Sequence, residues 1–158
     1  MSSAATRGME PTGGLADIGQ SGRGHAVFVS DFLHLARPFE QLAALLLDPC
    51  GPWLGAAQRS ASAQRFTVTS GEPRQYDSVV IVPMHWEPEH FDELVPAIDA
   101  DIELSSLGAD HCRLSLSGRY RLPLAQLDIG SDHLATHRAS EAAVRRFLSE
   151  IAQALETA

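Results

Sequence analysis

The stretch that decides the fold is residues 98–122, IDADIELSSLGADHCRLSLSGRYRL. Apolar and polar residues alternate in each half of this stretch, and strict alternation predicts two half-buried β-strands. Residues 108–110, Gly-Ala-Asp, separate the two halves and predict the loop of an antiparallel hairpin. The chain is therefore expected to contain an antiparallel sheet with one apolar and one polar face.

The loop also predicts the register of this hairpin. It places Ile102 opposite Leu116 on the apolar face and Asp99 opposite Arg119 on the polar face. The polar face is acidic on one strand and basic on its neighbour, and opposite charges across a strand pair support this register.

Three other segments complete a prediction of five strands, namely 25–35, 65–70 and 78–86. Residues 78–86 are apolar on both faces over their first half, which predicts a central strand covered on two sides. Pro83 lies inside this strand and requires either a bulge or an unpaired position, because proline has no N–H.

Helical patterns follow the first strand and end the chain. Pro38 favours a first helix turn, and the predicted helix 39–47 ends at Asp48-Pro49. Trp53 and Leu54 are expected in a short turn, and residues 55–64 give no clear pattern. Residues 127–155 predict a helix about 40 Å long, with an apolar stripe formed by Leu134, Val144, Leu148, Ile151, Ala152 and Leu155.

Composition limits the class of protein. The 158 residues are 44% hydrophobic and carry 12 basic against 20 acidic side chains, a net charge of −8. This argues for one folded domain over 24–158 and against nucleic acid as a partner. Residues 1–23 are rich in small and polar residues and predict a disordered tail. No apolar run could span a bilayer, so membrane insertion is not expected and a cytoplasmic location is.

Two local features carry a resemblance to a known superfamily. Residues 36–40, Ala-Arg-Pro-Phe-Glu, and residues 45–49, Leu-Leu-Leu-Asp-Pro, follow the first strand, and a segment with Trp53 comes next. This opening, with the closing helix around residues 145–155, resembles the START-like helix-grip superfamily (SRPBCC), which includes polyketide cyclase/dehydrase and lipid-transfer domains. The resemblance implies an α+β fold in which a curved antiparallel sheet grips a long C-terminal helix, with two short helices after the first strand. It carries over no catalytic residue.

The start of the long helix contains the residues best suited to chemistry. His133, His137 and Glu141 recur every four residues and fall near the apolar stripe, so they are expected to face the sheet. His137 could act as a general acid or base oriented by Glu141. Alternatively, the first helix turns extend beyond the sheet and these side chains are simply solvated. A divalent metal could also use this trio. Only three ligands are present and no known motif is matched, so neither a metal nor a cofactor is assigned.

The inner face of the sheet supplies further candidates. Met84 and Trp86 are expected to point inward and His85 outward, so that a thioether and an aromatic ring form either a ligand-binding wall or ordinary core. Tyr120 lies on the inward side and could present its hydroxyl to a ligand, or be a core tyrosine. Val144 completes the predicted lining from the helix.

Three functions remain open from the sequence. The first is a binding domain that holds an apolar or aromatic small molecule, such as a lipid or polyketide, between the helix and the sheet. The second is a cyclase- or dehydratase-type enzyme that moves a proton with His137 and Glu141 or with Tyr120. The third is an interaction subunit whose interior is filled by its own side chains. No oligomeric state is predicted.

Overall fold

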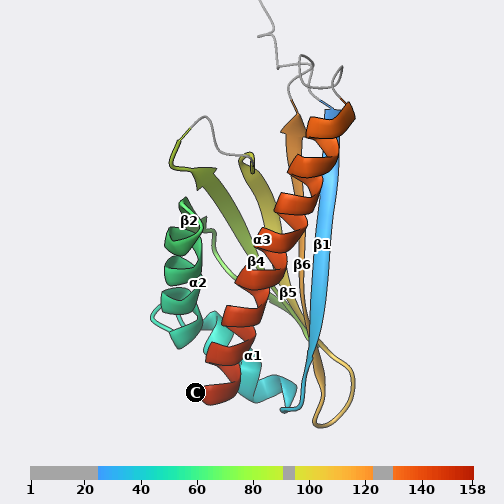
Figure 1. The fold of residues 1–158 in the computed structure, drawn as a ribbon. Coiled ribbons are helices and arrows are strands. Elements are labelled where there is room, and N and C mark those ends of the chain that lie inside the picture. Colours follow the sequence, from blue (N-terminus) through green and yellow to red (C-terminus); the bar gives the residue numbers. More distant parts are fainter. Residues whose placement is uncertain (1–24, 91–94, 123–129) are drawn as a thin grey trace, which may run out of the picture.

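The structure is a computed structural model that describes residues 25–90, 95–122 and 130–158. Its elements are, in order, β1 (His25–Leu35), α1 (Phe39–Leu47), α2 (Pro52–Ala63), β2 (Phe66–Ser70), β3 (Arg74–Tyr76), β4 (Val79–Pro88), β5 (Ile98–Ser106), β6 (Cys112–Leu122) and α3 (Gly130–Thr157). Figure 1 shows α3 running along one face of the sheet, with α1 and α2 on the same side. This is the helix-grip arrangement, so the predicted α+β fold is confirmed.

The described strands form one six-stranded antiparallel sheet in the order β1-β6-β5-β4-β2, with β3 also paired to β4. The hairpin register is confirmed, because Ile102 pairs with Leu116 and Asp99 pairs with Arg119. We call the face toward α3 the inner face and the opposite one the outer face. β1 is an edge strand that pairs with β6 along its whole length, which joins the first described strand to the last.

The sheet differs from the sequence prediction in two respects. The five-strand count was one short, because residues 74–76 form the exposed strand β3, which exists through its pairing with β4 and has no apolar pattern of its own. The prediction that residues 78–86 are covered on both faces was also wrong. All three described helices lie on the inner face (Figure 1), and the outer residues Val79, Ile81 and Pro83 are only half-buried.

Pro83 is accommodated without a bulge between β4 and β5. The register of these two strands runs unbroken through the pair Pro83 and Asp101. The carbonyl of Pro83 accepts the backbone N–H of Gly71 at 2.8 Å, on the side away from β5. Because the N–H and C=O of one strand residue point to the same side, the missing donor faces the gap between β2 and β3. No hydrogen bond between β4 and β5 is lost.

The two short helices cover one end of the inner face. The prediction for 39–47 is confirmed by α1, whereas the turn expected at Trp53 and Leu54 is wrong because both residues belong to α2. Gly51 precedes this helix and Pro52 occupies its first position, where a missing N–H costs nothing. The sequence of α2 shows no clear apolar pattern, because its buried side consists mainly of small residues. Trp53, Ala56 and Ala57 are buried on this side, and α2 packs against α3 and β2.

The long helix α3 packs against the inner face through a set of buried apolar side chains, namely Ala143, Val144, Phe147, Leu148, Ile151, Ala152 and Leu155. Leu134 was predicted in this stripe but is 48% exposed. Leu134 precedes the buried Ala152 by 18 residues, which is five full turns at 100° per residue, so both lie on the same side of the helix. The exposure of Leu134 therefore reflects its place near the start of α3, where His133 and His137 are also only half-buried.

The end of α3 is fixed by a residue from the beginning of the fold. The Arg37 guanidinium donates to the backbone carbonyl of Leu155 at 2.7 Å. Carbonyls in the last turn of a helix have no partner within the helix, and a cation there also favours the helix dipole. Arg37 therefore ties the segment after β1 to the C-terminal turn of α3.

Two other predictions fall partly outside what the structure describes. The tail predicted for residues 1–23 lies outside the described residues. Among the described helices, none is both long and apolar enough to cross a membrane.

Candidate functional site

A polar cluster lies in the interface between α3 and β6. The hydroxyl of Tyr120 is 3.1 Å from Nδ1 of His137, and Nε2 of His137 is 3.5 Å from a carboxylate oxygen of Glu141. When Nδ1 is unprotonated it accepts the Tyr120 O–H, and Nε2, which then carries the proton, faces the Glu141 carboxylate. The result is a row of phenol, imidazole and carboxylate. His137 and Glu141 are two of the three residues that were expected to face the sheet.

The three residues of this polar cluster differ in how deeply they are buried. Tyr120 is 1% exposed, the His137 side chain is 31% exposed, and the Glu141 side chain is 50% exposed. Burial raises the pKa of the Tyr120 phenol, and its hydrogen bond to Ser140 opposes that rise. Tyr120 therefore remains a neutral donor at physiological pH. The three side chains together extend from the buried interior to the solvent.

The other predicted lining residues belong to the apolar interior. Trp86, Met84 and Val144 are buried, with Met84 and Trp86 pointing inward and His85 outward as expected. The Trp86 ring lies 4.5 Å from that of Phe147 and 5.8 Å from that of Phe66, measured between centroids. Its indole N–H is buried and has no hydrogen-bond partner among the residues that the structure describes, although a buried indole normally finds one.

The interface closes progressively along α3. His133 and His137 are half-buried near the beginning of the helix, whereas Val144, Leu148 and Leu155 are fully buried. The space between the sheet and the C-terminal half of α3 is thus filled by the protein's own side chains. Two cavities lined by described residues lie elsewhere: one is on the outer face, and the other is between α2 and the end of α3.

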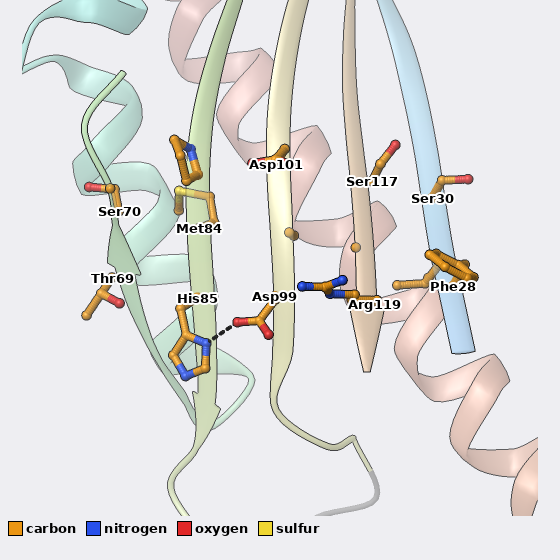
Figure 2. A pocket seen from close by; sticks show the side chains of 15 residues that line it. Phe28, Ser30, Thr69, Ser70, Met84, His85, Asp99, Asp101, Ser117 and Arg119 are labelled. Atoms are coloured by element: carbon orange, nitrogen blue, oxygen red, sulfur yellow. Dashed lines mark hydrogen bonds and ion pairs between the residues drawn. The ribbon is translucent and has the colours of Figure 1, made fainter. Parts of the chain in front are cut away.

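The larger cavity, of about 900 Å³, is a groove across the outer face of the sheet. It is formed by three consecutive residues from each of five strand segments, listed as 28–30, 69–71, 83–85, 99–101 and 117–119. We call it the outer groove. Figure 2 shows it from the side opposite α3, with the labelled side chains standing along the strands. Its volume is within the range of small-molecule sites.

Two rows of outward side chains border the outer groove. One row consists of directly paired residues on β4, β5, β6 and β1, which are, in that order, His85, Asp99, Arg119 and Phe28. The row between the two borders points inward and includes Ala100 and Gly118. A Cβ on Gly118 would lie 2.8 Å from Cγ2 of Ile98. Gly118 therefore permits close packing of β6 against β5 at this position.

Charge in the outer groove is arranged around His85. Its Nδ1 is 2.7 Å from Asp99 Oδ1, the contact dashed in Figure 2, and its Nε2 is 3.0 Å from Glu87 Oε2. Hydrogen bonds to Asp99 and then to Glu87 raise the pKa of His85. The sequence analysis did not identify this groove, although the paired alternation of residues 83–85, 99–101 and 117–119 could have placed these side chains in rows.

No metal cluster of three His, Cys, Asp or Glu side chains is found in the described part of the chain. The two cysteines do not change this view: Cys50 is exposed, and Cys112 is a buried thiol whose pKa is raised by burial.

Comparisons with known proteins add the following. No family model matches this chain, and no curated protein sequence matches it. An aromatase/cyclase from Streptomyces sp. R1128 is 13% identical with a TM-score of 0.45, covering 84% of this chain and 93% of that one. Norcoclaurine synthase from Thalictrum flavum is 11% identical with a TM-score of 0.45, covering 97% of each chain. A conserved protein from Geobacillus kaustophilus is 11% identical with a TM-score of 0.48, covering 81% and 94%. At these values the function is argued from the chain's own geometry.

Proposed function

We propose that this chain binds an apolar or aromatic small molecule, of lipid or polyketide type, between α3 and the sheet at the end marked by Tyr120 and His137. The observation that carries this proposal is the Tyr120–His137 hydrogen bond, which places a phenol and an imidazole in an interface whose other buried side chains are mostly apolar, apart from Thr136 and Ser140. Burying polar groups is unfavourable unless they are paired, and a ligand with a hydroxyl or carbonyl could take the place of either partner.

The ligand would enter from the His137 side, because exposure falls along α3 from there toward Val144. Met84, Trp86 and Val144 would line its apolar part, and the free indole N–H of Trp86 could donate to a polar atom of the ligand. Tyr120 is 1% exposed, so binding requires α3 to move from the sheet at this end. The free energy of that opening lowers the apparent affinity.

The experiment uses Trp86 as the reporter. The chain has two tryptophans, so Trp53→Phe leaves Trp86 as the single emitter. Palmitate and the dye 1-anilinonaphthalene-8-sulfonate are titrated while Trp86 emission is followed, and native mass spectrometry of the purified protein is used to detect a bound molecule. We expect quenching or a shift of Trp86 emission. The absence of a co-purifying molecule together with unchanged emission for both probes would rule the proposal out.

A second candidate function rests on a specific observation, the chain from Glu141 through His137 to Tyr120. A carboxylate that orients an imidazole, which in turn accepts from a phenol, is suited to general acid–base catalysis of the cyclase or dehydratase kind. A molecule recovered from the protein is incubated with the wild type and with His137→Ala. Loss of water, seen by mass spectrometry only with the wild type, and equal melting temperatures for the two proteins would support catalysis. Conversion by both proteins would rule out His137.

A further inference from the structure

Arg119 is the unsatisfied charge of the outer groove. It pairs directly with Asp99 across β5 and β6, yet the carboxylate of Asp99 is held by His85 at 2.7 Å. Within the described residues no hydrogen bond or ion pair engages the Arg119 guanidinium. Because the Asp99 carboxylate is held by His85, the Arg119 guanidinium is available to pair with an anion.

Two further features of the groove accompany this cation. Phe28 pairs directly with Arg119 from β1 and is 74% exposed, the largest exposure among the large hydrophobic side chains described. Asp101 lies on β5 one row along from Asp99, so it is diagonal to Arg119, and side chains in diagonal positions are about 7–8 Å apart. Asp101 likewise has no hydrogen-bond or ion-pair partner among the described residues.

We propose that the outer groove binds a small aromatic carboxylic acid. The carboxylate pairs with Arg119, which can hold it through two parallel N–H groups. The ring contacts Phe28 and removes that apolar surface from water. Asp101, on the other side of Arg119 from Phe28, disfavours acids whose second group is an anion. This site is on the opposite face of the sheet from the Tyr120–His137 cluster and does not depend on the proposed function there.

The probe is 2-naphthoate, which carries one carboxylate on a flat ring system. Its uncharged counterpart, 2-naphthamide, has the same shape and tests the charge. Binding is measured by calorimetry and by amide shifts in two-dimensional NMR. We expect the acid to bind at least about tenfold more tightly than the amide, because hydrogen bonds between charged partners are stronger than neutral ones. The shifts should concentrate on residues 28–30, 99–101 and 117–119.

Matched variants test the residues. Arg119→Gln should weaken binding of the acid about tenfold, while Arg113→Gln, on the same strand and face but paired with Glu103 outside the groove, should not. Phe28→Ser should weaken binding, while Phe32→Ser, an exposed phenylalanine on the same strand outside the groove, should not. All four side chains are exposed, so folding is not at risk.

Three outcomes would overturn the proposal. The first is no shift at millimolar naphthoate, the second is equal affinity for acid and amide, and the third is equal losses in Arg119→Gln and Arg113→Gln. Tyr120→Phe separates this site from the inner one, because it should leave naphthoate binding unchanged. If naphthoate binding fell with Tyr120→Phe and not with Arg119→Gln, the acid would occupy the inner site and the outer groove would be excluded.

Discussion

Substituting Gly118 by alanine tests whether close packing at the centre of the sheet shapes this fold. The added Cβ would lie 2.8 Å from Cγ2 of Ile98, 3.0 Å from Cβ of Ala100 and 3.2 Å from the carbonyl oxygen of Asp99. Favourable carbon–carbon contacts are about 3.5–4.0 Å apart. None of these three atoms is at the end of a long flexible side chain, so the strands themselves have to move.

The magnitude follows from two opposing effects. Inserting a methyl group into a packed core costs about 1–3 kcal/mol. Replacing glycine by alanine also reduces the freedom of the unfolded chain, which stabilises the protein by about 0.4–1 kcal/mol. We expect Gly118→Ala to lower the free energy of unfolding by about 1–2 kcal/mol. For a chain of this size that corresponds to a fall of roughly 2–8 °C in melting temperature.

The assay is urea unfolding followed by circular dichroism, with Ser117→Ala as the control because Ser117 is exposed on the outer face. The double variant Ala100→Gly/Gly118→Ala removes one of the two side chains that the new methyl meets. It should be more stable than the sum of the two single changes predicts. A Gly118→Ala protein as stable as the wild type, or additive effects in the double variant, would refute the reasoning that this row is closely packed.

Three further predictions concern single hydrogen bonds. Tyr120→Phe should lower the free energy of unfolding by about 0.5–1.5 kcal/mol in urea titrations, and no change would mean that its hydroxyl bonds equally well to water. Arg37→Gln should destabilise the protein by about 1 kcal/mol through the loss of the bond to Leu155, while Arg146→Gln, exposed on α3, should have little effect in the same thermal scans. His85 has a raised pKa, so its stabilising pairs are fully present below pH 6.5 and are lost as pH rises through the folded-state value. The melting-temperature difference between wild type and His85→Gln should therefore shrink as pH increases from 5 to 9, and a difference that grows would contradict the assignment.

The features that local pattern determines were predicted from the sequence. Residues 98–122 alternate so regularly that any shift of register would expose one apolar set, so the pairs of this hairpin could be assigned before the structure. The bounds of α1 followed from Pro38 and from Asp48-Pro49, since proline and extended backbone limit where a helix can run. The inward direction of Met84 and Trp86 followed from the same two-residue period.

The features that required three-dimensional information were missed or only half predicted. Strand β3 has no apolar period and forms because β4 offers it an edge. Leu134 fits the stripe by spacing, and only the structure shows that the side chains near the start of α3 remain open to solvent. The outer groove is lined by residues from five separate segments of the sheet, so no single segment of the sequence encodes it.

The pairing of β1 with β6 has a consequence for the chain during its synthesis. Leu35 pairs with Cys112, so β1 can form none of its hydrogen bonds to β6 until the ribosome has added Cys112. Ribosomes add about 5–20 residues per second, so this delay is roughly 4–15 s. Throughout it, Phe28 and Phe32 stand on an unpaired strand, and such strands readily pair with other chains. The nascent chain is thus most prone to aggregation through the same strand that later forms one wall of the outer groove.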